Sequence, residues 1–240
     1  MIVCKHISGK FLKGAMGVLG VLCLALTSCV KSTSDNIAAS APTALLTVIQ
    51  ASPDEPALTF YLNNSLVSQS SLNYGFGIDY FSAIAGTRIA NFYDSSSKLV
   101  LASTIKLAPN NAYSLFMDNI PSKPGTLLLN DTLTKPASGN ASLRFVNLSP
   151  DAPAVDLVVE GGQTLVKNRS FEGFSSFSPI PGKSSYTFQI VKTGTSTVLA
   201  SLPYVPINNG NVYTIVFEGL ANPTGVEDKL TAVLITNAEF

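Results

Sequence analysis

The sequence has no tryptophan, one histidine, three cysteines and few charged residues, which make up 12% of its 240 residues. Its 15 basic and 15 acidic side chains give a formal net charge of zero, so no basic surface is expected that could neutralise nucleic-acid phosphates. The low charge does not indicate disorder, because 46% hydrophobic residues, including 13 phenylalanines, can offset the entropy of ordering. The length admits one large domain or two of about 100 residues.

The first 28 residues have the composition of an export signal. Lys5, Lys10 and Lys13 precede an apolar run over residues 15–26, and the segment contains no acidic residue. The run is shorter than the ~20 residues that a membrane-spanning helix needs, which favours a cleaved signal over a permanent transmembrane anchor. We therefore predict a signal peptide over residues 1–28.

Leu26-Thr27-Ser28-Cys29 resembles the lipobox of bacterial lipoproteins, in which an aliphatic residue and two small residues precede an obligatory cysteine. The resemblance implies that the signal is cut before Cys29 and that acyl chains on Cys29 hold the protein on a membrane. Val30 is not the aspartate that retains enterobacterial lipoproteins at the inner membrane, which favours the outer membrane. The alternative is an ordinary secreted protein in which this cysteine occurs by chance.

Cleavage would remove most of the reactive side-chain types. It takes away the only histidine, His6, together with Cys4 and Cys23, so the mature chain has no Ser-His-Asp triad, no Cys-His pair, no ordinary zinc site and no internal disulfide. Loss of three lysines leaves 12 basic and 15 acidic residues, a net charge of about −3. We therefore predict no catalytic residue, no cofactor and no metal site.

Paired carboxylates, or serine with lysine, are the remaining routes to catalysis. Asp54-Glu55 and Glu227-Asp228 are each adjacent in sequence and are expected to point apart, whereas glycosidase-type catalysis needs two carboxyls ~5–9.5 Å apart across a cleft. A carboxylate-dependent hydrolase is accordingly the third hypothesis for the function, behind two non-enzymatic ones.

An internal repeat organises the rest of the chain. Residues 51–57, Ala-Ser-Pro-Asp-Glu-Pro-Ala, recur as Leu-Ser-Pro-Asp-Ala-Pro-Ala at residues 148–154, an offset of 97. Before the repeats lies a stretch rich in Ser, Thr, Ala and Pro without periodicity. We predict a flexible tether over residues 29–44, a first repeat over residues 45–137 and a second repeat over residues 138–240.

Each repeat alternates short apolar runs with turn residues and shows no helical periodicity. Asn63-Asn64 and Gly161-Gly162 occupy corresponding places between two such runs and indicate hairpin turns that need positive φ. About seven strands per repeat predict an all-β protein with two tandem antiparallel β-sandwich domains, immunoglobulin-like or transthyretin-like. The cysteine and tryptophan core of antibody domains is absent.

The second repeat carries the motif S-P-D-A-P-A-V-D at residues 149–156, preceded by Arg144-Phe145-Val146-Asn147. In these residues the chain resembles a family of bacterial lipoproteins and secreted proteins with tandem copies of the domain of unknown function 4397. The resemblance covers essentially the whole mature chain and implies a β-sandwich. It brings no assigned activity, although some members are labelled as adhesion proteins.

The first repeat departs from this motif, because Glu55, Leu58 and Thr59 stand where the second repeat has Ala, Val and Asp. A role of Asp156 would therefore hold in one repeat only. The aspartates of the two S-P-D-x-P loops are hard oxygen ligands that suit calcium. One carboxylate per loop is too few for a tight site, so we favour the interpretation that proline fixes φ and the aspartate caps its own turn.

Tyr61, Tyr80 and Tyr93 have no aromatic counterpart in the second repeat, although each adjoins a phenylalanine whose position is apolar in both repeats. Because successive strand residues point to opposite faces, the three tyrosines are expected on outer faces. They could form a ligand platform for sugar or peptide. They could equally pack against the second repeat or be strand-favouring surface residues. The absence of tryptophan argues against a carbohydrate as the ligand.

Asp131-Thr132-Leu133 matches the short pattern at which Bacteroidota attach O-glycans, although three residues often match by chance. Taken together, the sequence predicts a lipid-anchored lipoprotein of the bacterial cell envelope that acts as a binding or adhesion module and not as an enzyme. Its expected partners are the membrane, through acyl chains on Cys29, and a glycan or protein ligand, without nucleic acid. A structural or assembly partner of an outer-membrane or periplasmic complex is the alternative.

Overall fold

The computed structural model describes residues 41–223 and 228–240, and this part of the chain is all-β. Sixteen strands form four sheets, and no helix occurs among the described residues. The predicted signal peptide, Cys29 and most of the predicted tether lie outside them. The first strand begins at Thr43, so the last two residues of the predicted tether, 43 and 44, already belong to the sheet.

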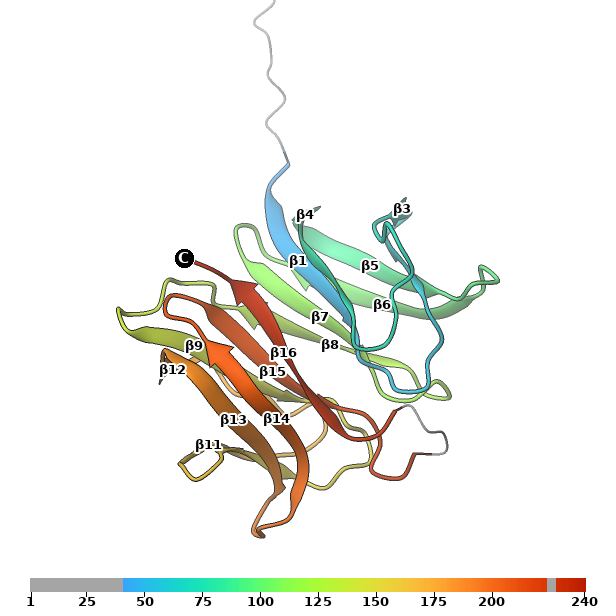
Figure 1. Ribbon diagram of the computed structural model, residues 1–240. Helices are drawn as coiled ribbons and strands as arrows, with labels where there is room; N and C mark the ends of the chain where they lie inside the picture. The colour runs from blue at the N-terminus through green and yellow to red at the C-terminus, as the bar shows by residue number, and fades with distance from the viewer. Residues whose placement is uncertain (1–40, 224–227) are drawn as a thin grey trace, which may run out of the picture. The chain divides into compact units, whose positions relative to one another are not determined.

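Strands β1 to β8 belong to the first repeat and form two sheets of four strands (Figure 1). The inner sheet has the order β4-β1-β7-β8, and the outer sheet has the order β3-β2-β5-β6. Their bounds are β1 Thr43–Gln50, β2 Thr59–Leu62, β3 Ser65–Leu66, β4 Gly77–Ile84, β5 Gly86–Tyr93, β6 Leu99–Leu107, β7 Ala112–Asp118 and β8 Gly125–Asp131.

Strands β9 to β16 belong to the second repeat and copy this topology strand for strand. The inner sheet has the order β12-β9-β15-β16, and the outer sheet has the order β11-β10-β13-β14. The same order in both halves agrees with an internal duplication. The bounds are β9 Asn140–Asn147, β10 Val155–Val159, β11 Thr164–Arg169, β12 Ser178–Pro181, β13 Lys183–Lys192, β14 Val198–Ile207, β15 Val212–Glu218 and β16 Thr231–Ala238.

One strand pair in each inner sheet is parallel, which corrects the expectation of purely antiparallel sheets. β1 pairs with β7 from Leu45↔Ala112 to Gln50↔Met117, and β9 pairs with β15 in the same sense. The chain makes this pairing after crossing to the outer sheet and back, because parallel neighbours cannot be joined by a tight hairpin. Sequence alternation reports which face a residue takes but not the direction of its neighbour.

Each repeat has its own apolar core between its two sheets. In the first repeat Leu46 and Leu115 of the inner sheet meet Phe60 and Phe92 of the outer sheet, all with no exposed surface. The two phenylalanine rings lie 5.1 Å apart between centroids. The second repeat packs Phe145, Leu157, Phe188 and Ile215 between its two sheets in the same way.

A third apolar cluster joins the two repeats through their inner sheets. Ile49 and Phe116 of the first repeat pack with Val146 and Val216 of the second, and each is at most 5% exposed. Every residue of β7 and of β15 is buried, because one face of each strand meets its own core and the other face meets the partner repeat. The described residues accordingly belong to one compact unit.

Candidate functional site

Two of the three singled-out tyrosines form a pair on the outer sheet of the first repeat. Tyr61 lies on β2 and Tyr93 on the neighbouring β5, with ring centroids 5.3 Å apart at 76°. Both rings are half-buried and lie on the face opposite to the buried Phe60 and Phe92, as strand alternation predicts. Such an edge-to-face contact is a favourable aromatic geometry and holds both rings in place. We call these residues the tyrosine pair.

A shallow cavity of about 320 Å³ lies at the tyrosine pair. Its remaining lining is polar and comes from Thr59, Asn63, Asn64, Asp94 and Ser97. The backbone of Asn63 has φ +54°, and its Oδ1 accepts a hydrogen bond from the N–H of Ile89 at 2.9 Å, so the hairpin turn is fixed. The cavity therefore combines an aromatic wall with a rim of amide, hydroxyl and carboxylate groups.

Asp94 gives this rim a fixed negative charge. Its Oδ1 accepts hydrogen bonds from the hydroxyl of Ser96 at 2.7 Å and from the backbone N–H groups of Ser96 and Lys98. These hydrogen bonds, the Ser96 hydroxyl first, hold the pKa of Asp94 below its usual value. The carboxylate is thus ionised at neutral pH, and its orientation is set by the turn.

The second repeat lacks the tyrosine pair. In the first repeat Tyr61 lies opposite Asn91 and Tyr93 lies opposite Thr59. In the second repeat Val158 lies opposite Gln189 and Val191 lies opposite Asp156, so Val158 and Val191 stand where the first repeat has its two tyrosines. The tyrosine pair is therefore not required by the fold that both repeats share. It is a property of the first repeat alone.

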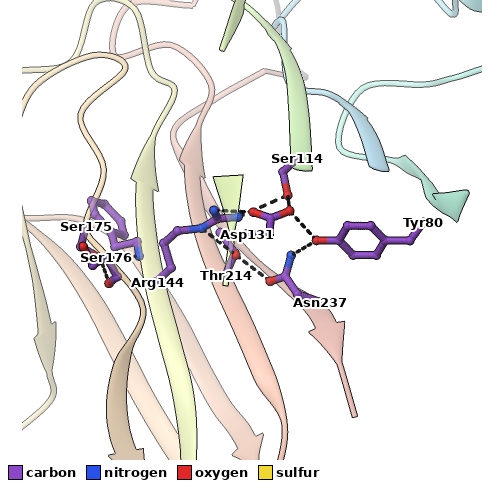
Figure 2. A network of polar contacts seen from close by, with 9 residues as sticks. Tyr80, Ser114, Asp131, Arg144, Ser175, Ser176, Thr214 and Asn237 are labelled. Carbon is purple, nitrogen blue, oxygen red and sulfur yellow. Dashed lines mark hydrogen bonds and ion pairs between the residues drawn. The ribbon is translucent and has the colours of Figure 1, made fainter. Parts of the chain in front are cut away.

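Tyr80 lies apart from the tyrosine pair, on β4 of the inner sheet. Its hydroxyl donates to Asp131 Oδ2 at 2.6 Å and accepts a hydrogen bond from Asn237 Nδ2 of the second repeat at 3.1 Å (Figure 2). Burial, and next the charge of Asp131, raise the pKa of this phenol. Tyr80 thus packs against the second repeat, which was one of the alternatives for the three tyrosines. The three tyrosines do not share one surface.

Tyr80 belongs to a polar network between the repeats that sequence reasoning missed. Asp131, the last residue of β8, forms an ion pair with Arg144 of β9, with 2.6 Å between Oδ1 and Nη1. The two residues are only 4% and 2% exposed. Thr214 accepts a hydrogen bond from Arg144 Nε at 3.2 Å and donates to Asn237 Oδ1 at 2.7 Å, which closes a ring back to Tyr80 (Figure 2).

The network leaves both buried charges well satisfied. Asp131 also accepts a hydrogen bond from the Ser114 hydroxyl at 2.8 Å, and the Arg144 guanidinium lies 4.5 Å from the ring centroid of Phe177. A buried ion pair offsets its desolvation only with additional hydrogen bonds of this kind. We define Tyr80, Ser114, Asp131, Arg144, Thr214 and Asn237 as the interface network.

Two buried carboxyls lie at the far ends of the central strands. Asp118 ends β7 and Glu218 ends β15, and they are 0% and 1% exposed. Both oxygens of Asp118 and Oε2 of Glu218 have no hydrogen-bond partner among the described residues. Neither residue belongs to a motif of the sequence, although the acidic residue recurs at the same place in each repeat.

Each buried carboxyl faces acidic groups, and this shifts its titration. Burial, and next the charge of Glu172, raise the pKa of Asp118 to about 7. Burial, and next the charge of Asp228, raise the pKa of Glu218 to about 8. Tyr74 of the first repeat lies near enough to Glu218 for its own pKa to be raised by burial and by that charge. The two groups can therefore hold protons near neutral pH.

In each repeat, the serine of the S-P-D-x-P loop forms a hydrogen bond to another loop of the same repeat. Ser52 Oγ donates to the carbonyl of Asn119, and Ser149 Oγ donates to the carbonyl of Gly219, both at 2.6 Å. Asp151 accepts hydrogen bonds from the backbone N–H groups of Ala221 and Asn222. Asp151 therefore binds the backbone of a loop about 70 residues away, whereas the sequence predicted that it caps its own turn.

The remaining aspartates of the motif also make backbone contacts. The N–H of Asp54 donates to the carboxylate of Asp228, whereas Glu227, its sequence neighbour, lies outside the described residues. Asp156 accepts hydrogen bonds from the N–H of Asn168 at 2.8 Å and from the Thr193 hydroxyl at 2.6 Å. Among residues 41–223 and 228–240, no group of three or more His, Cys, Asp or Glu side chains could hold a metal ion.

Thr132, the candidate O-glycan acceptor, is exposed just after β8. The neighbouring Asp131 is buried in the interface network, and Leu133 is half-buried. In the described part of the chain, no helix is long and apolar enough to cross a membrane.

Comparisons with known proteins give a family match and little else. No curated protein matches the chain. Among solved structures, a leucine-rich repeat protein from Bacteroides thetaiotaomicron is similar at 13% identity and a TM-score of 0.17, over 79% of this chain and 26% of its own. The chain thus spans about a quarter of that protein, and the likeness carries no argument. Residues 44–158, the first repeat and the beginning of the second, match the model of a domain of unknown function (DUF4397).

Proposed function

We propose that the protein is a lipid-anchored lipoprotein of the bacterial cell envelope, whose first repeat binds a glycan or peptide ligand at the tyrosine pair. It comprises a cleaved signal peptide (1–28), a tether that ends before β1 (29–42) and two tandem β-sandwich domains (43–137 and 138–240). One observation carries the proposal: Tyr61 and Tyr93 form a half-exposed aromatic pair with a polar rim that the second repeat lacks. The fold does not need this pair, which favours a role in recognition.

The cavity suits recognition better than catalysis. Aromatic faces stack on apolar faces of sugars or side chains, while the rim amides and the Asp94 carboxylate supply directed hydrogen bonds. A hydrolase that works with two carboxyls would need a second one across this cavity, and Asp94 is the one acidic residue in its lining. The proposal is therefore a non-enzymatic binding or adhesion module.

Replacing the tyrosine pair tests the binding site. We expect Tyr61→Ser/Tyr93→Ser to weaken binding at least about tenfold on a glycan and peptide array, because aromatic anchors dominate recognition energy. Tyr204→Ser is the matched control, since Tyr204 is 82% exposed in the second repeat. The melting temperature of each variant is measured in parallel. Unchanged array binding together with a large fall in the melting temperature of the double variant would assign the rings to packing instead.

The anchor is tested on whole cells. Protease treatment of intact cells should release peptides of residues 41–240, and mass spectrometry should find an acylated fragment beginning at Cys29. Cys29→Ser should move the protein from the membrane to the soluble fraction. Protection until the outer membrane is breached would contradict a surface adhesin and favour the assembly partner. Absence of an acylated Cys29 would overturn the anchor.

A further inference from the structure

A cleft of about 540 Å³ opens along one side of the second repeat. It lies between the edge strands of the two sheets, with residues of β11 and β12 on its walls. Three basic residues, Arg144, Lys167 and Arg169, are among those that line it, together with the hydroxyl residues Ser175, Ser176 and Ser178. No acidic residue is among the residues that line it. We call it the basic cleft.

The three basic residues of the cleft differ in whether their polar groups already have a partner. Arg144 is committed to Asp131 in the interface network. Lys167 is exposed, and Arg169 is half-buried with its Nε enclosed and without a hydrogen-bond partner among the described residues. A buried N–H donor without an acceptor is costly, so a ligand oxygen at this position would recover free energy.

A backbone irregularity lies between these two side chains. The pairing of β10 with β11 shifts register between Val155↔Arg169 and Leu157↔Val166, and Asn168 between Lys167 and Arg169 has φ +55°. Such a bulge interrupts the alternation of faces and re-aims side chains at a sheet edge. Lys167 and Arg169 both line the basic cleft, whereas Asn168 between them does not.

The first repeat offers an internal comparison. A cleft beside β4, lined by residues 67–73 and 76–81, has about 520 Å³ and includes Ser68, Ser70 and Ser71. Its lining contains no lysine or arginine, and it contains one carboxylate, Asp79. Two clefts of nearly equal size, one beside β12 and one beside its counterpart β4, therefore differ in the sign of the charged residues that line them. The basic residues of the second repeat are not needed to build this edge of the sandwich.

We propose that the basic cleft binds a small ligand through an oxyanion, a carboxylate or a phosphate, held by Arg169 and Lys167. Arginine presents a planar set of donors that matches the two oxygens of such groups. The serine hydroxyls supply further donors along the wall. This site lies on another repeat than the tyrosine pair and does not depend on it.

The basic cleft is tested by titrating the full chain with inorganic phosphate and with acetate at constant ionic strength. Binding is measured by calorimetry and by changes in amide chemical shifts. We expect saturable binding with shifts concentrated at β11 and β12. Arg169→Gln and Lys167→Gln should each weaken it at least fivefold. Tighter binding of phosphate or of acetate then identifies the class of anion.

Lys106→Gln is the matched control, because Lys106 is an exposed lysine on β6 of the first repeat and its loss changes the net charge equally. Lys167→Gln alters an exposed side chain, so it reports on binding even where Arg169→Gln fails to fold. The proposal is overturned when neither anion binds saturably, when the cleft variants bind as the parent does, or when Lys106→Gln weakens binding equally.

Discussion

Arg144→Met should lower the free energy of unfolding by about 3 to 5 kcal/mol. The substitution keeps most of the side-chain volume but leaves Asp131 charged and buried without its cation, and breaking a buried pair on one side costs this much. It also removes the hydrogen bonds that Arg144 donates to the hydroxyl oxygens of Thr214 and Ser114. Chemical denaturation at neutral pH measures the loss.

The double variant Arg144→Met/Asp131→Leu separates the cost of an unpaired charge from the worth of the pair. With both charges gone, we expect most of the lost stability to return, since an apolar replacement of a buried ion pair is often neutral. Asp79→Asn, which removes an exposed carboxyl of the first repeat, should change stability by less than about 0.5 kcal/mol. A single variant as stable as the parent would contradict the closed network.

The protein should lose stability as the pH rises from about 4 to about 8. Asp118 and Glu218 have pKa values of about 7 and about 8 in the folded state and near 3.8 and 4.5 when unfolded. The folded state thus binds more protons than the unfolded state across this window, so the stabilisation is complete below the unfolded pKa values and falls as pH rises through the folded ones. For Glu218 the loss is on the order of 4 kcal/mol.

Glu218→Gln should flatten this pH profile and make the variant more stable than the parent at pH 9. The amide cannot ionise, so it avoids the cost of a buried charge beside Asp228. Denaturation curves at pH 5, 7 and 9 measure the effect, and Asp118→Asn should act in the same direction with a lower midpoint. Asp79→Asn again serves as the control, because Asp79 is exposed. If the free energy of unfolding of the parent rises from pH 5 to pH 9, the prediction that Asp118 and Glu218 are protonated in the folded state is wrong.

Local pattern was enough to predict the all-β fold and the outer positions of Tyr61 and Tyr93. Alternation places Tyr61 and Tyr93 opposite Phe60 and Phe92 because each strand has one face in the core of its own repeat. The same logic gives Tyr80 an outer face but cannot say that a second repeat covers that face.

The interface network shows what the sequence could not reveal. Arg144 precedes the S-P-D-A-P motif, and Asp131 was noted only as part of a candidate glycosylation pattern. Their pairing depends on how two inner sheets meet, since Arg144 lies on β9 and Asp131 at the end of β8. No periodicity within either repeat encodes that contact. The parallel pairing of β1 with β7 escaped prediction for the same reason, because strand direction is set by the path of the chain between them.

This parallel pairing has a mechanical consequence. β1 is the first described strand, yet it lies inside its sheet between β4 and β7 and is hydrogen-bonded on both sides. A pull on the chain just before Thr43 runs along the axis of β1 and strains the bonds to both neighbours together, in shear, whereas an edge strand peeled from its end would lose them one after another. A head held from its amino end against flow would bear the load on a strand that is hydrogen-bonded on both sides.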